Sequence, residues 1–347
     1  FNNMYYRSKA PFRLGIAGGG TDVSPYSDIY GGAVLNVTVN LYAHASIKPL
    51  NNGKIVLRHV NDNVLETIDL MHELPLTGPL VLQRGIYNSI IKKHNNGIPL
   101  SLELTTYIDV PSGSGLGTSS TIAVSIIGAF IEYLKLPLGD YDIAQYAFEI
   151  ERNDLVMAGG KQDQYAATFG GVNFMEFYAN ERVIVNPLRI SQDILNEWGN
   201  NTLLYFTDTR RQSARIIEEQ ANNVVSHNLP SIEAMHKVKE EAYRIKELLL
   251  RNCLTDLGKA LNIGWEYKKK MSSSITTPLV DEIYNTALEC GALGGKISGA
   301  GGGGFMFFYC PGISKYQVSQ VLEKKYKGKV FKIEFVEKGL TTWTTKD

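Results

Sequence analysis

Residues 108–134, IDVPSGSGLGTSSTIAVSIIGAFIEYL, hold the features from which the fold can be worked out. Apolar and polar residues alternate over 100–110 and predict a strand, which ends in a loop with glycines at 113, 115 and 117. The apolar stretch over 122–134 predicts a buried helix, and its interruptions by polar residues and glycine argue against a membrane span. We therefore expect a strand, a glycine loop and a helix in succession.

This arrangement of loop and helix suits a phosphate. Alternating glycines let the backbone turn tightly, and the helix N-terminus behind them offers unpaired N–H groups and a partial positive charge. The hydroxyls that follow, Thr118, Ser119 and Ser120, can cap the helix or bind Mg²⁺. The loop has neither the lysine of a Walker A motif nor the glycine spacing of a dinucleotide site. By itself it is compatible with a phosphate site or with an ordinary strand-to-helix connection.

Two further glycine-rich segments change that balance. Residues 10–22 read APFRLGIAGGGTD, and residues 296–305 read KISGAGGGGF. In this order, the three segments resemble the three motifs of the GHMP kinases, the family of galactokinase, homoserine kinase, mevalonate kinase and phosphomevalonate kinase. The resemblance runs from about residue 7 to about residue 310. It implies ATP and Mg²⁺ as cofactors and a two-domain fold, with an N-terminal ribosomal-protein-S5-like domain and a C-terminal split ββαβ-like domain with extra helices.

The composition sets further bounds. The chain has 347 residues, enough for two domains that share a cleft. Basic and acidic residues number 35 each, so no net field favours nucleic acid or a membrane surface, and we expect neither as a partner. The three cysteines, at 253, 290 and 310, form no CxxC pair, which argues against a disulfide framework or a zinc site and fits the cytoplasm. We expect a monomer or homodimer.

The order of the expected elements indicates an α+β fold, because helices and strands come in blocks without regular alternation. We place the domains at 4–190 and 191–347, with the boundary in the polar stretch 188–201. Expected strands lie at 5–16, 33–48, 54–60, 64–70, 100–110, 172–178, 182–187, 202–207, 295–297, 305–309 and 330–336. Expected helices lie at 80–93, 122–134, 140–153, 162–169, 211–227, 231–251, 255–271, 278–290 and 314–326.

Asp163 and Arg13 are the candidate catalytic pair. Asp163 stands in GGKQDQYAATFGG, a short helix flanked by glycine pairs that permit close approach of a substrate. From spacing alone it is equally well a favourable carboxylate at a helix N-terminus. The resemblance implies that Asp163 is the catalytic Asp and that Arg13, in APFR, favours its charged form and stabilises the transferred phosphoryl group.

The resemblance also indicates which residues bind the nucleotide and the metal. Glu151 stands twelve positions before Asp163, the spacing at which members of the family carry a magnesium-binding Glu. Spacing alone favours an exposed helix carboxylate or a partner of Arg152 for Glu151, and the resemblance reverses that preference. Ser119 would be the second magnesium ligand. The expected nucleotide-binding residues are Pro111, Gly113, Ser114, Gly115, Leu116, Gly117, Thr118, Ser119 and Ser120.

Two other segments are candidates for binding the acceptor, the molecule that receives the phosphoryl group. Asp22, in GGGTD, falls where relatives use a carboxylate for sugar hydroxyls, although an Asp after a glycine turn is often a cap. Arginines at the start of the helix in TDTRRQSARII gain nothing from the helix dipole, so they indicate an anionic partner or salt bridges with nearby glutamates. The expected acceptor-binding residues are Gly19, Gly20, Thr21, Asp22, Arg210, Arg211, Arg215, Gly301 and Gly302.

The first motif, AGGGTDVSPY, departs from galactokinases and mevalonate kinases and resembles kinases of heptose phosphate and fucose that act at an anomeric hydroxyl. The arginine cluster favours a phosphorylated acceptor. The implied reaction converts D-glycero-D-manno-heptose 7-phosphate and ATP into the 1,7-bisphosphate, for the nucleotide-activated heptose of bacterial surface glycans. An L-fucose kinase is the alternative, and a catalytically silent sensor of sugar and ATP is a more distant one.

Overall fold

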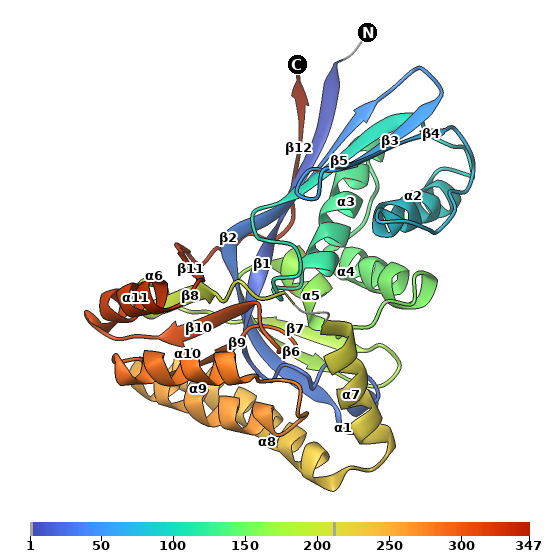
Figure 1. Cartoon of the computed structure of the whole chain (residues 1–347). Coiled ribbons are helices and arrows are strands. Elements are labelled where there is room, and N and C mark those ends of the chain that lie inside the picture. The colour runs from blue at the N-terminus through green and yellow to red at the C-terminus, as the bar shows by residue number, and fades with distance from the viewer. Residues whose placement is uncertain (1–2, 211–212) are drawn as a thin grey trace.

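Strand β1 (Met4–Ala17) pairs on one side with β2 (Gly32–Pro49) and on the other with β12 (Thr341–Lys346), as the computed structural model shows (Figure 1). The structure describes residues 3–210 and 213–347. Within these residues eight strands form the larger sheet, in the order β12-β1-β2-β5-β3-β4, while β6 extends from β2 and carries β7. Its other strands are β3 (Lys54–His59), β4 (Val64–Asp69), β5 (Leu102–Ile108), β6 (Val172–Phe177) and β7 (Val183–Pro187).

Helix α3 (Thr118–Leu134) packs against β1 and β2 and forms part of the core. Its residues Ile126 and Phe130 are fully buried, and burial of one such side chain stabilises the fold by roughly 1.5–3 kcal/mol. Gly128 brings the helix against Leu340, because a Cβ at this position would lie 2.6 Å from Leu340 Cδ1. Around α3 lie α2 (Val81–His94), α4 (Asp140–Glu149), the π-helical turn η1 (Ile150–Asp154) and α5 (Gln162–Phe169).

The second half of the chain builds a smaller sheet, in the order β11-β8-β10-β9, with a layer of helices. Helices α8 and α9 pack against each other, α9 covers β9, and α8 also reaches β1 and β2 of the larger sheet (Figure 1). The strands are β8 (Thr202–Phe206), β9 (Gly294–Ile297), β10 (Phe305–Tyr309) and β11 (Lys329–Phe331). The helices are α7 (Ser213–Val225), α8 (Leu229–Leu250), α9 (Leu254–Lys269), α10 (Pro278–Glu289) and α11 (Ser314–Lys325).

The α+β class is confirmed, and most expected elements form within a few residues of their predicted ends. Three elements were not expected: α1 (Tyr26–Tyr30), α6 (Gln192–Asn201) and β12. The stretch chosen as the domain boundary contains α6, which Ser191 caps and which buries Trp198. Its polar composition hid the helix, because only Ile194, Leu195 and Trp198 of α6 pack against the hydrophobic core.

The strand expected at 330–336 was predicted too long. β11 ends at Phe331, and the chain then crosses to the larger sheet, where Phe335 forms a bridge with Val39 and the Val336 N–H donates to the Thr38 carbonyl. The residues after this crossing form β12. The chain described after residue 191 therefore contributes to both sheets, and the division at 190/191 remains a prediction.

Candidate active site

A cavity of about 710 Å³ lies where the three glycine-rich segments meet. The closest approach is between the second and third segments: the Phe305 N–H donates to the Ser114 carbonyl at 3.0 Å, and a Cβ on Gly299 would lie 2.2 Å from the Gly115 oxygen. Glycine is needed at 299 because no side chain fits there. Segments that are far apart in the sequence thus form one wall of the cavity.

The loop before α3 has backbone conformations that suit an anion site. Gly113, Gly115 and Gly117 all have positive φ, at 72°, 86° and 74°. Such conformations allow successive backbone N–H groups to form a concavity that binds anions. Gly117 precedes the first turn of α3, whose N–H groups have no partners within the helix. The hydroxyl oxygens of Ser114 and Thr118 are buried, and neither has a hydrogen-bond partner among the described residues.

Not every residue of the predicted nucleotide loop can offer a side chain to the cavity. The Leu116 side chain is fully buried in the core, and Pro111 and Ser114 do not line the cavity. Ser120 accepts a hydrogen bond from Gln164 Nε2 at 3.1 Å. Any contact from Leu116 to a nucleotide must therefore come from its backbone.

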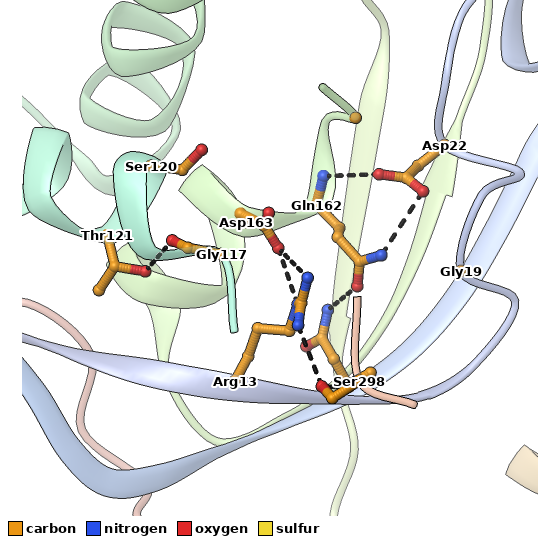
Figure 2. A network of polar contacts seen from close by, with 12 residues as sticks. Arg13, Gly19, Asp22, Gly117, Ser120, Thr121, Gln162, Asp163 and Ser298 are labelled. Atoms are coloured by element: carbon orange, nitrogen blue, oxygen red, sulfur yellow. Dashed lines mark hydrogen bonds and ion pairs between the residues drawn. The ribbon is translucent and has the colours of Figure 1, made fainter. Parts of the chain in front are cut away.

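The structure brings Arg13, which is buried, and Asp163, which is partly exposed, together as an ion pair (Figure 2). Arg13 Nε and Nη2 both lie 2.7 Å from Asp163 Oδ1, and Arg13 Nη1 donates to Ser298 Oγ at 3.2 Å. A Cβ on Gly117 would lie 2.6 Å from Asp163 Cγ, so the carboxylate rests directly against the end of the glycine loop. None of the described residues makes a hydrogen bond to Asp163 Oδ2. Arg13 thus holds one carboxylate oxygen, while both oxygens lie within 3 Å of the position of a Cβ on Gly117.

Glu151 lies at the first turn of η1, against the start of α3. Its side chain is 1% exposed and accepts hydrogen bonds from Ser119 Oγ at 3.1 Å and Gln164 Nε2 at 3.0 Å. Burial raises the pKa of Glu151, against the opposing effect of Arg152 3.6 Å away. A hydroxyl and a carboxylate beside a phosphate-type loop match the oxygen ligands that Mg²⁺ takes. The described residues contain no cluster of three or more His, Cys, Asp or Glu, so phosphate or water oxygens would complete such a site.

Asp22 is buried and has a structural role. Its Oδ2 accepts from the backbone N–H groups of Lys161, at 2.9 Å, and Gln162, at 3.1 Å, at the start of α5. Its Oδ1 accepts from the Gly20 N–H at 3.2 Å and lies 3.5 Å from Gln162 Nε2 (Figure 2). Four donors match the four acceptor positions of a carboxylate. The geometry fits the capping role considered for this residue and leaves its predicted contact with a sugar a prediction.

The other predicted acceptor residues lie in different places. Gly19, Gly20 and Gly301 line the cavity, whereas the Thr21 hydroxyl is used inside the loop, donating to the Gly18 carbonyl at 2.7 Å. The Gly302 N–H donates to the Ile275 carbonyl, away from the cavity lining.

Arg210 and Arg215 do not line the cavity, and their predicted contact with the acceptor stays a prediction. Arg210 is exposed, and its Cβ lies 3.6 Å from the position of a Cβ on Gly113, beside the glycine loop. Arg215 is exposed and does not line the cavity, and Arg211 lies outside the described residues.

Two lysines in the cavity lining were missed by sequence reasoning. Lys268 on α9 and Lys296 on β9 are 2% and 5% exposed. The run Lys268–Lys270 gave no indication of which lysine points inward. The helical period could have done so, because Lys268 follows the buried Trp265 by three positions and Leu261 by seven.

Family models match both halves of the chain. Residues 82–171 match the model described as GHMP kinases N terminal domain, and residues 245–328 match the one described as GHMP kinases C terminal. The chain therefore belongs to the GHMP kinases, as the three motifs predicted, and is a phosphotransferase. Kinases of this family take the phosphoryl group from ATP. Among the described residues, no helix combines the length and apolarity needed to cross a membrane.

Within the family, the chain is similar to heptose phosphate kinases. It is 45% identical to D-glycero-alpha-D-manno-heptose 7-phosphate kinase of Campylobacter jejuni, over 97% of this chain and 98% of that protein. It superimposes with a TM-score of 0.84 and 42% identity on a D-glycero-D-manno-heptose 1-phosphate kinase of Bacteroides thetaiotaomicron, covering 99% and 100% of the two chains. It is 26% identical to the L-fucokinase/L-fucose-1-P guanylyltransferase of Bacteroides fragilis, over 88% of this chain but 35% of that protein.

Proposed function

We propose that this protein transfers the γ-phosphoryl group of ATP to the C1 hydroxyl of a sugar, D-glycero-D-manno-heptose 7-phosphate, and forms the 1,7-bisphosphate. The observation that carries the proposal is the Arg13–Asp163 ion pair held against Gly117, at the meeting point of the glycine loop and the cavity. The similarity to the Campylobacter heptose kinase along nearly the whole chain supports this choice of acceptor. The product would enter the synthesis of nucleotide-activated heptose, and the use of ATP fits the cytoplasm.

Asp163 is the proposed general base. Its Oδ2 accepts the proton of the C1 hydroxyl as that oxygen attacks the γ-phosphorus, while Oδ1 stays bound to Arg13. General-base assistance of this kind contributes roughly 10²–10⁴ in rate. Arg13 holds the carboxylate in position and adds positive charge next to the equatorial oxygens of the transferring group.

The N-terminus of α3 and the loop before it are the proposed site for the ATP phosphates. The backbone N–H groups after Gly113 and the buried hydroxyl of Thr118 would donate to phosphate oxygens. The apolar end of the cavity, which Val64, Leu80 and Ile108 line, would receive the base. Ser119 and Glu151 would hold Mg²⁺, which when bound neutralises charge on the β- and γ-phosphates.

A comparison of acceptors tests the substrate. ADP release is measured with Mg-ATP and, in parallel, with D-glycero-D-manno-heptose 7-phosphate, L-fucose, galactose and mannose. We expect kcat/KM to be highest for the phosphorylated heptose. Turnover of L-fucose without any response to the heptose phosphate would replace our proposal with an L-fucose kinase. Nucleotide and sugar binding without turnover of any of them would favour a sensor.

A further inference from the structure

Two buried ammonium groups point at the same spot beside Gly19. A Cβ on Gly19 would lie 3.2 Å from Lys268 Nζ, 3.7 Å from Lys296 Nζ and 3.8 Å from Gln162 Nε2. The two lysines come from different elements, α9 and β9, and both line the cavity. Three nitrogen donors thus surround one position, and the absent side chain of Gly19 leaves that position open.

Neither lysine has a partner that accounts for its burial. Among the residues that the structure describes, no carboxylate lies within 4.0 Å of either ammonium, and Lys268 Nζ makes one long hydrogen bond of 3.4 Å to the Gly19 carbonyl. Lys161, buried in the same region, has an ion pair with Asp28 at 3.1 Å. Burial of an unpaired charge is costly, and proteins normally avoid it. The contrast with Lys161 indicates that Lys268 and Lys296 bind an anion that the chain itself does not supply.

The electrostatic surroundings support this interpretation. Burial lowers the pKa of Lys268 to about 8, although Asp22 opposes the effect. Burial, and then the charges of Lys268 and Arg13, lower the pKa of Lys296 well below its usual range. The attraction of a bound anion would offset both the cost of burying these cations and their mutual repulsion.

A further unpartnered donor lies on the other side of the same loop. Gln220 of α7 is 2% exposed and lines the cavity, and its Nε2 has no hydrogen-bond partner among the described residues. Its Oε1 lies 3.1 Å from the position of a Cβ on Gly20. The Gln220 amide therefore lies beside this loop, with its acceptor oxygen close to Gly20.

This group of donors lies away from the proposed phosphate site of ATP. Figure 2 shows Gly117 on one side of the Arg13–Asp163 pair and Gly19, with Asp22 and Gln162, on the other. A group that enters beside Gly19 therefore belongs to the acceptor.

We propose that Lys268 and Lys296, at Gly19, form the subsite that binds the phosphate already carried by the acceptor. A phosphate monoester brings about two negative charges and three acceptor oxygens, which match two ammonium groups and a glutamine amide. The assignment rests on the proposed function, because it gives the 7-phosphate of the heptose its partners. It also gives Arg210, which lies beside Gly113, no part in binding that phosphate.

The experiment compares Lys268→Met and Lys296→Met with the wild type, and all three proteins are saturated with ADP. Calorimetry measures the Kd of D-glycero-D-manno-heptose 7-phosphate and of the same heptose without phosphate. We expect each variant to weaken binding of the phosphorylated sugar roughly 10- to 100-fold, the range for a lost hydrogen bond to a charged group, and to leave the plain heptose nearly unchanged. Lys269→Met is the matched control, because Lys269 is the next residue on α9 and pairs with Glu266 at 2.9 Å.

The outcomes separate this proposal from the proposed function. Equal losses for both sugars, or no loss for either, would overturn the lysine subsite and leave the heptose kinase standing. If the wild type does not phosphorylate the heptose phosphate, the proposed function fails, and inorganic phosphate becomes the probe. Phosphate binding to the ADP-saturated wild type that is lost in Lys296→Met would then support an anion site at the lysines. Equal phosphate binding by both proteins, or none by the wild type, would overturn it.

Discussion

The loops at 113–117 and 18–20 are both rich in glycine, but they serve the cavity in different ways. In the first, three glycines have positive φ just before the N-terminus of α3, so in the proposed ATP site the donors are backbone N–H groups. In the second, Gly19 leaves space for side chains from α9 and β9. Backbone N–H groups do not titrate, whereas buried lysines lose their charge as the pH rises. Of the two proposed sites, the one at 113–117 should therefore be insensitive to pH and the one at Gly19 sensitive to it.

Asp163→Asn should have the largest effect, because Asp163 lies between the two loops and is the proposed base that accepts the proton of the acceptor hydroxyl. We expect kcat to fall roughly 10²- to 10⁴-fold, while KM for ATP changes little. Steady-state ADP release measures both constants. Asp193→Asn, at an exposed position in the first turn of α6, is the control. Near-normal kcat in Asp163→Asn would rule out the proposed base.

Gly117→Ala tests whether the first loop depends on conformation, on space or on both. Its φ is 74°, and the new Cβ would meet Asp163 Cγ at 2.6 Å, so we expect kcat to fall by roughly tenfold or more together with a loss of stability. Gly53→Ala separates the two causes. Gly53 has a φ of 68° and no atom within 4 Å of the new Cβ, so the cost should appear in the melting temperature alone. An active Gly117→Ala would show that Asp163 can move aside.

Glu151→Gln keeps the shape of the side chain and removes its charge. If Glu151 holds Mg²⁺ beside the first loop, the Mg²⁺ concentration for half-maximal rate should rise by roughly tenfold or more, since the metal loses its charged protein ligand. A Mg²⁺ titration at fixed ATP measures this half-maximal concentration. Gln145→Glu, on the neighbouring helix α4, is a control for a change of charge nearby. An unchanged titration curve would exclude Glu151 as a ligand.

Lys268→Met should give the smallest effect, and this effect is a gain in stability. Removing an unpaired buried charge should raise the melting temperature of the ligand-free protein, by roughly 2–4 °C per kcal/mol gained. The folded pKa of Lys268, about 8, lies below its ordinary 10.5, so between these values the unfolded chain keeps a proton that the folded protein has released. Wild-type stability therefore rises with pH across this window, and the advantage of the variant is largest below pH 8 and shrinks toward pH 10.5.

Thermal melts of both proteins at several pH values check this prediction. Lys269→Met again serves as the control, because its lysine is paired and more exposed. A variant that is less stable than the wild type at pH 7 would show that Lys268 stabilises the fold.

Sequence patterns predicted local structure well and distant partners poorly. The glycine loop and α3 follow from residues close together in the chain, so 108–134 gave them directly. The pairing of Arg13 with Asp163 spans 150 positions and came from the family resemblance, not from periodicity. Neither periodicity nor the resemblance predicted the hydrogen-bond donors of Asp22. The backbone N–H groups that donate to its carboxylate lie at the start of α5, far along the chain.

The pairing of β12 with β1 also bears on the order in which the protein can fold. Met4 lies opposite Lys346, so this edge of β1 has no strand beside it until residues 341–346 have left the ribosome. An unpaired edge strand can associate with other chains, and long-range pairing slows folding. During synthesis, this edge of β1 therefore stays unpaired while the whole second half is made, unless a chaperone covers it.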